Sequence, residues 1–251
     1  QPYPFPARMA KHNKWSKVKH RKAVVDKRRG KVWTKVSKAI IVAARHGGPD
    51  PDSNLALRYA IDEGRYANMP RDTIERAIKK GAGGEDTSQY ESIRYEGYAP
   101  GGVAVIVEAL TDNRTRTIGE VRLAFSDHDG SVGASGCVSY LFESKGQIVV
   151  SGEGLSEDRV MEAAIEAGAV DVEFIGDDKT PAWMISTEPA AFQTVKAQLE
   201  KAKLPVSDAE IAMVPATYIS VTGENAENVA ELVEALEDLD DVQKVWTNAG
   251  D

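Results

Sequence analysis

The chain has 251 residues and a net charge of −8; 42 % of its residues are hydrophobic and 28 % are charged, as is typical of globular domains. Its single cysteine, Cys137, excludes an intrachain disulfide and a cysteine-rich metal cage. No run of apolar residues approaches the roughly 20 that a membrane-spanning helix needs.

The charge is distributed unevenly along the chain. Residues 1–81 hold 20 Lys and Arg against 7 Asp and Glu, a net charge of +13, whereas residues 82–251 hold 11 against 32, a net charge of −21. The stretch KHNKWSKVKHRK at 11–22 contains six Lys or Arg and no acidic residue. Such a basic end of an acidic chain indicates a segment that binds a polyanion, because Lys and Arg release counterions from phosphates. The alternative is a solvated basic tail without a specific partner.

The first elements in chain order are helices. Residues 1–8 have the composition of a leader or tag, and residues 9–81 predict a basic helical domain. A short helix over 18–29 is expected to end at Gly30, and a second helix to end at Gly47 and Gly48. The second helix carries an apolar stripe made of Trp33, Val36, Ile40 and Ala44.

Two more helices complete this domain. The third, about 54–66, is expected to turn Leu55, Tyr59 and Ile61 inward, and Pro70 suits the first turn of the fourth. The glycine-rich residues 81–88 then predict a linker to the rest of the chain.

The remaining chain alternates between strand and helix patterns. It predicts a buried strand at 102–110, a helix at 115–130, and a strand pair at 137–143 and 147–152 that turns around Lys145-Gly146. Helices at 156–168, 189–202 and 225–239 then alternate with strands at 170–175, 182–187, 206–213, 217–223 and 241–247. The fold class is therefore α+β and multidomain: an N-terminal helical bundle followed by two α/β sandwich domains of ferredoxin-like type.

The candidate nucleic-acid contacts all lie in the basic segment. Phosphates are expected to attract its lysines and arginines, while Trp15 either stacks on a base or packs the segment onto the helical domain. The predicted contacts are Lys11, Lys14, Trp15, Lys17, Lys19, His20, Arg21, Lys22, Lys27, Arg28, Arg29 and Lys31, with Lys35 and Lys38 as weaker candidates.

A polar cluster, TDNRTRT at 111–117, separates the predicted strand from the helix that follows it. The favoured interpretation is a helix N-cap, because Thr, Asp and Asn side chains accept hydrogen bonds from the first backbone N–H groups of a helix. The alternative is a secondary anion contact through Arg114 and Arg116 near the positive end of the helix.

No motif for a nucleotide, a metal or a catalytic nucleophile occurs in the sequence, so we predict no enzyme, no catalytic residue, no cofactor and no metal site. Two rival interpretations remain open. One is an enzyme with its site between the two α/β domains. The other is a protein-interaction module that uses the acidic helix at 224–241.

Five segments resemble the YebC/PmpR family, which includes the mitochondrial translational activator of cytochrome oxidase subunit I. They are MAKHNKWSKVKHRKAVVDKRRGKVWTK, GGPDPDSNLALRYAI, NMPRDTIERAIKKG, YEGYAPGGVAVIVEALTDNRTRT and residues 130–142, where Asp129-Gly130-Ser131 replaces a Gly-Gly pair. The resemblance implies three domains. The middle α/β domain would join 88–134 with 215–248, around an inserted domain at 135–214.

The resemblance also implies a function. Members are described as DNA-binding transcriptional regulators, and others act in translation on the ribosome or on messenger RNA. The implied partner is therefore DNA or RNA, with the ribosome as an alternative, and neither a membrane nor a small-molecule substrate is predicted. The run Asn13-Lys14-Trp15-Ser16-Lys17 resembles the mitochondrial branch, but the start at Met9 favours a bacterial cytoplasm.

Overall fold

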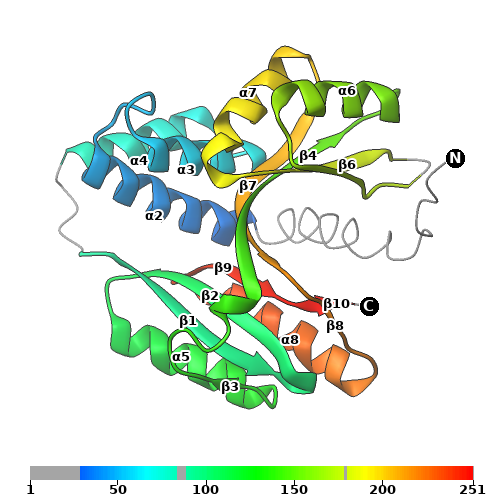
Figure 1. Ribbon diagram of the computed structural model, residues 1–251. Coiled ribbons are helices and arrows are strands. Elements are labelled where there is room, and N and C mark those ends of the chain that lie inside the picture. Colours follow the sequence, from blue (N-terminus) through cyan, green and yellow to red (C-terminus); the bar gives the residue numbers. More distant parts are fainter. Residues whose placement is uncertain (1–28, 84–88, 178–179, 251) are drawn as a thin grey trace, which may run out of the picture. The chain divides into compact units, whose positions relative to one another are not determined.

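The computed structural model describes residues 29–83, 89–177 and 180–250 (Figure 1). These residues form two compact units. The smaller unit comprises residues 145–211, and the larger unit comprises the described residues up to Ser144 together with 212–250. The smaller unit is therefore inserted into the sequence of the larger one. None of the helices in the described residues is long and apolar enough to cross a membrane.

Three helices form the first part of the larger unit, and their lengths follow the predicted periodicity. They are α2 (Arg29–Gly47), α3 (Leu55–Tyr66) and α4 (Arg71–Ala82). The predicted stripe is confirmed: Val36, Ile40 and Ala44 are buried, and Trp33 packs against them and donates from Nε1 to the carbonyl oxygen of Ala67 over 3.0 Å. The positive φ of Gly48 ends α2 as expected.

Two details of the helical prediction are wrong. Gly30 does not end a helix but lies within α2, and the rest of the helix expected over 18–29 lies outside the described residues. Leu55 is the first residue of α3 and is 52 % exposed, because Leu57, two positions later, faces the core instead. Asn54 caps α3 and accepts a hydrogen bond from the backbone N–H of Leu57 over 3.1 Å.

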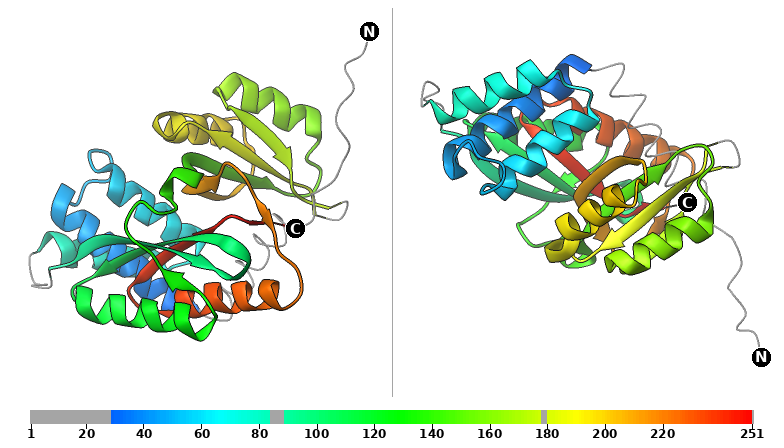
Figure 2. Two further views of the ribbon diagram at one scale, coloured as in Figure 1. Left: turned by 60° about the horizontal axis from the view of Figure 1, so that its bottom comes forward. Right: turned by 90° about the horizontal axis from the view of Figure 1, so that it is seen from above.

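An antiparallel sheet with two covering helices forms the second part of the larger unit. The strand order is β3-β1-β2-β9, and Figure 2 shows α5 and α8 side by side along one face. Their side chains and those of β1, β2 and β9 form one apolar core. The elements are β1 (Glu91–Ala99), η1 (Pro100–Gly102), β2 (Val103–Thr111), α5 (Arg114–Asp127), β3 (Ser131–Val132), η2 (Ser139–Leu141), β8 (Ile219–Ser220), α8 (Glu224–Asp238), β9 (Val242–Thr247) and β10 (Ala249–Gly250).

The central strand β2 is buried along almost its whole length, as its apolar run predicts. Its neighbour β1 was not predicted. Most of its residues before Glu96 are polar or exposed, so the hydrophobic signal is weak, and nine consecutive pairs with β2 define the strand instead. A tertiary pairing has here overridden a weak local pattern.

The smaller unit has the strand order β5-β6-β4-β7 and the chain order βαββαβ, which is the ferredoxin-like arrangement that was predicted. Its helices α6 and α7 contact one another. The elements are β4 (Phe142–Ser151), α6 (Glu157–Ala167), β5 (Asp171–Phe174), β6 (Ala182–Thr187), η3 (Pro189–Ala191), α7 (Phe192–Lys201) and β7 (Val206–Pro215).

The predicted turn at Lys145-Gly146 is wrong, because β4 runs through both residues as one continuous strand. Gly146 pairs with Thr187 of β6. A Cβ atom at Gly146 would collide with the Thr187 hydroxyl and come within 2.6 Å of Phe192, so the glycine serves a close approach between segments.

Candidate nucleic-acid interface

The predicted contacts from Lys11 to Arg28 lie outside the described residues. Arg29 begins α2, and the next predicted contact, Lys31, has an exposed side chain. The weaker candidates Lys35 and Lys38 follow on the same helix, at a spacing of four and then three residues. This spacing places the three lysines on one face of α2.

These three lysines of α2 meet the C-terminal end of α8. Lys31 Nζ donates to the carbonyl oxygen of Asp238 over 3.3 Å, and Lys35 Nζ to that of Glu237 over 2.6 Å. Lys38 Nζ donates to the carbonyl oxygen of Asp240 over 3.2 Å. The last carbonyl groups of a helix have no partner within the helix and carry partial negative charge, so ammonium groups stabilise this end.

Asp241, which follows this helix end, gathers donors from three other elements. Its Oδ1 accepts from Lys38 Nζ over 2.9 Å, and its Oδ2 accepts from Arg116 Nη2 over 2.6 Å. The hydroxyls of Thr117 and Thr111 donate to the same Oδ2 over 2.8 and 3.0 Å. Only 5 % of the Asp241 side chain is exposed, so this carboxylate is a buried junction between α2, β2, α5 and the entry to β9.

The protonation of the junction follows from these contacts. Burial alone would raise the pKa of Asp241, but the hydrogen bonds from Arg116, Lys38 and Thr117 lower it to about 2. Burial lowers the pKa of Lys35 to about 8, against the opposing effect of the acidic residues at the end of α8. Asp241 is therefore a carboxylate throughout the physiological range, while Lys35 begins to lose its proton just above it.

The cluster at 111–117 is built around this junction. Asn113 is the N-cap of α5 and accepts from the backbone N–H of Arg116 over 3.0 Å, as the favoured interpretation predicts. The Arg116 guanidinium also contacts Asp112 at 2.9 Å, and Arg114 lies 3.6 Å from Glu91. Both arginines are thus next to carboxylates of the same chain, and their role as anion contacts stays a prediction.

Sequence reasoning missed the acidic half of this arrangement. The run EDLDD at Glu237–Asp241 has four acidic residues in five, which is a visible signal. Its partner could not be identified, because Asp241 lies 203 positions after Lys38 in the chain. The acidic helix offered as a partner surface thus uses its C-terminal end to contact a basic helix of the same protein.

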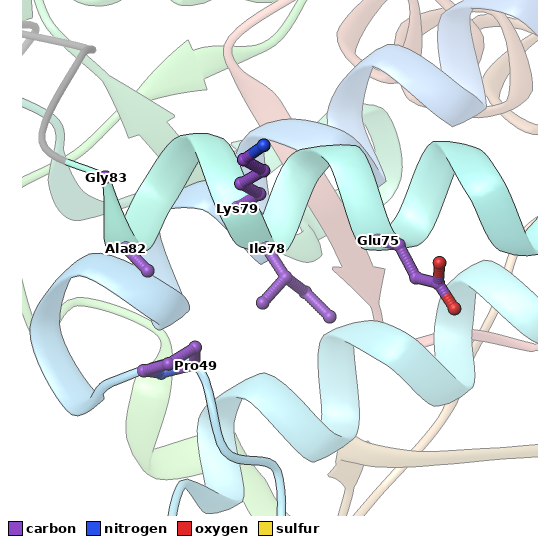
Figure 3. A pocket seen from close by; sticks show the side chains of 6 residues that line it. All are labelled: Pro49, Glu75, Ile78, Lys79, Ala82 and Gly83. Carbon is purple, nitrogen blue, oxygen red and sulfur yellow. The ribbon is translucent and has the colours of Figure 1, made fainter.

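Exposed basic residues also lie on α4, where none was predicted to contact nucleic acid. Arg71 pairs with Glu75 at 2.7 Å, and Arg76 donates to the carbonyl oxygen of Asp72 over 3.2 Å. A shallow depression beside α4 is shown in Figure 3, where Ile78 points toward Pro49 and Lys79 points away from it. Its lining is mostly apolar, so it is unlike a phosphate-binding surface.

A second buried carboxylate holds a loop of the larger unit. Glu96 accepts hydrogen bonds from the backbone N–H groups of Gly136, Val138 and Ser139 over 2.9, 2.8 and 2.9 Å. Burial alone would raise the pKa of Glu96, but these three donors lower it below its ordinary value. Within the described residues, no group of three or more His, Cys, Asp or Glu is arranged to hold a metal ion.

Comparison with known proteins gives two family matches. Residues 13–84 match the TACO1/YebC protein N-terminal domain, and residues 90–249 match the TACO1/YebC second and third domain. Together they span nearly the whole chain.

Individual relatives agree with these matches. A protein of Citrifermentans bemidjiense named "Probable transcriptional regulatory protein" is 50 % identical over 240 residues, which are 96 % of this chain and 95 % of that protein. A protein of the same name from Desulforamulus reducens is 49 % identical over 242 residues, 96 % of this chain and 98 % of that protein. The crystal structure of a conserved hypothetical protein from Aquifex aeolicus is 50 % identical, with a TM-score of 0.80 over 90 % of this chain and 91 % of that one. The predicted resemblance is thereby confirmed, and the chain belongs to the TACO1/YebC family.

Proposed function

We propose that this protein is a non-enzymatic regulator of gene expression that binds nucleic acid through the basic segment at residues 11–31. The observation that carries this proposal is the charge distribution: a net charge of +13 in residues 1–81 precedes −21 in the remainder. A segment dense in Lys and Arg binds phosphates, whereas the acidic remainder repels them, so contact is confined to one end.

The names of the relatives support a role in regulation. Because proteins of about 50 % identity are named as probable transcriptional regulators, DNA is the first candidate target. Phosphate contacts carry no sequence information, so the same basic segment serves RNA equally well. The second candidate is therefore a translation factor on messenger RNA or the ribosome, the role that the resemblance to this family implies for some of its members. In a bacterial cell either role takes place in the cytoplasm.

The experiment measures the binding of labelled duplex DNA and of labelled single-stranded RNA at a series of salt concentrations, with fluorescence anisotropy as the readout. Replacing Lys17 and Lys19 by Glu should weaken binding by at least tenfold at 0.1 M salt and reduce the slope of log K against log salt by about 2. The matched control replaces the exposed Lys201 and Lys203 of the smaller unit by Glu, which gives the same change in net charge. Equal effects of the two double variants would contradict the proposed segment.

A second experiment separates the two candidate targets. Ultraviolet crosslinking in cells, followed by sedimentation, assigns the protein to ribosomal or messenger RNA if it co-migrates with ribosomes and carries RNA crosslinks. Enrichment at promoters in the same cells assigns it to transcription. Absence of binding to any nucleic acid at low salt would reject the proposal as a whole.

A further inference from the structure

The acidic end of α8, Glu237–Asp241, lies against the same face of α2 that carries the last predicted phosphate contacts. Lys31 and Lys35 donate to backbone carbonyl oxygens of this end, and the carboxylates of Glu237, Asp238 and Asp240 act electrostatically on Lys35. A row of oxygen acceptors with high negative charge is also what a nucleic-acid backbone presents to lysines. The arrangement on α2 therefore resembles a bound phosphate chain in that oxygen acceptors and negative charge lie against the same lysines.

The contacts between α2 and α8 differ in their exposure. The side chains of Lys31 and Asp238 are 52 % and 38 % exposed and their charged atoms lie 3.9 Å apart. Those of Lys38 and Asp241 are 15 % and 5 % exposed, with their charged atoms 2.9 Å apart. An exposed ion pair is weak and is screened by salt, whereas breaking a buried pair leaves an uncompensated charge. A competing polyanion can therefore displace the outer contact while the inner one persists.

We propose that the acidic end of α8 is an intramolecular phosphate mimic, which occupies Lys31 and Lys35 in the free protein and is displaced when nucleic acid binds. This inference rests on the proposed function. Lys38 and Asp241 keep α2 attached to the sheet throughout, so displacement frees two lysines without separating the helices from the rest of the larger unit. The contact lowers the apparent affinity for nucleic acid, because the phosphates must compete with the protein's own acidic residues for Lys31 and Lys35.

The first test measures affinity in the full chain. Replacing Asp238 and Asp240 by Asn should tighten binding of a 20-nucleotide single strand and of a 20-base-pair duplex by about three- to tenfold at 0.1 M salt. The control replaces Glu162 and Glu166 of α6 by Gln, which changes the net charge equally in the other unit and should change affinity less than twofold. Equal affinities for the two variants would overturn the inference.

The second test follows displacement in the unmodified protein. A carbodiimide couples Lys31 to Asp238 as an amide, and mass spectrometry measures the yield of this crosslink. Saturation with a 5′-hydroxyl oligonucleotide should reduce the yield at least threefold. The pair Lys244–Glu63, 2.5 Å apart and remote from the lysines of α2 in sequence, serves as the control and should keep its yield. An unchanged Lys31–Asp238 yield at saturation would overturn the inference even if the Asn variant failed to fold.

The two proposals fail in different ways. If neither the unmodified chain nor the Asn variant binds DNA or RNA, the proposed function is rejected, and the phosphate mimic is rejected with it. If both bind with the same affinity, the proposed function survives and the phosphate mimic is rejected.

Discussion

Lys38 Nζ donates to Asp241 Oδ1 over 2.9 Å and thereby joins two residues that are 203 positions apart in the chain. The same ammonium group lies 5.4 Å from the ring centre of Tyr90, just ahead of β1. Lys38 thus connects α2 to the residues that precede β1 and β9, which are the first and the last strand along the chain in the four-stranded sheet of the larger unit. A lysine that sequence analysis assigned to phosphate is in this structure a component of the buried junction.

Replacing Asp241 by Asn should lower the free energy of unfolding by about 2–4 kcal/mol. The amide is uncharged, so the largely buried ammonium group of Lys38 would lose its carboxylate, and the partly exposed guanidinium of Arg116 would keep only that of Asp112. Urea denaturation at pH 7 measures the change. Replacing the exposed neighbour Asp240 by Asn is the control and should cost less than about 0.5 kcal/mol.

The pH dependence of the same variant gives an independent check. The folded pKa of Asp241, about 2, is below its ordinary value near 4, so the folded state binds fewer protons between these two values. Asp241 therefore contributes its full stabilisation above pH 4 and loses it as the pH falls through 2, and this lowering is equivalent to about 2 kcal/mol. The stability difference between the unmodified protein and Asp241→Asn should shrink over this range. A constant difference down to pH 2 would contradict the assignment.

Replacing Lys38 by Met should destabilise the protein by about 1–3 kcal/mol, whereas Lys35→Met should change stability by less than about 0.5 kcal/mol. Removal of Lys38 leaves the buried Asp241 with one fewer charged donor. Lys35, by contrast, pays a burial cost that its partners do not offset, as its pKa of about 8 indicates. Met keeps most of the unbranched apolar part of a lysine side chain and removes its ammonium group, and thermal unfolding compares the two variants. A larger loss of stability in Lys35→Met than in Lys38→Met would contradict the conclusion that the Lys38 contact contributes more to stability.

Replacing Glu96 by Gln should destabilise the larger unit by about 1–3 kcal/mol, because a neutral amide has one acceptor oxygen where three backbone N–H groups need partners. Hydrogen exchange should quicken at the amides of Gly136, Val138 and Ser139 in particular. Glu108→Gln, which removes an exposed pair with Arg94, is the matched control. Unchanged exchange at all three amides would show that Glu96 does not hold this loop.

The helices were the easiest part of the fold to predict from sequence. The stripe of Val36, Ile40 and Ala44 is a local pattern, and its periodicity survives in the folded chain because the core of the three helices needs it. The capping by Asn113 is equally local. Such features depend on residues within a few positions of one another, so the sequence contains them directly.

The junction around Asp241 could not be predicted in this way. The sequence contains its lysines, its Thr-rich cap and its acidic run, but their meeting depends on how the chain returns to the sheet after the inserted unit. Charge patterning alone assigned Lys31, Lys35 and Lys38 to an external polyanion, because a sequence does not show whether an internal carboxylate competes for the same lysine. The wrong prediction of a turn at Gly146 has a similar cause, because the sequence does not show whether a glycine allows a turn or a close contact between two segments.

Replacing Gly146 by Ala tests that distinction. The new methyl group would meet the Thr187 hydroxyl and the Phe192 ring, so we expect a loss of about 1–3 kcal/mol in the free energy of unfolding. In Gly119→Ala, by contrast, the added Cβ has nothing within 4 Å on the exposed face of α5, and the variant should gain about 0.5–1 kcal/mol through helix propensity. Urea denaturation of the two variants should thus give changes of opposite sign. An unchanged free energy of unfolding in Gly146→Ala would contradict the close packing of Gly146 against Thr187 and Phe192, and with it the continuous strand through Gly146.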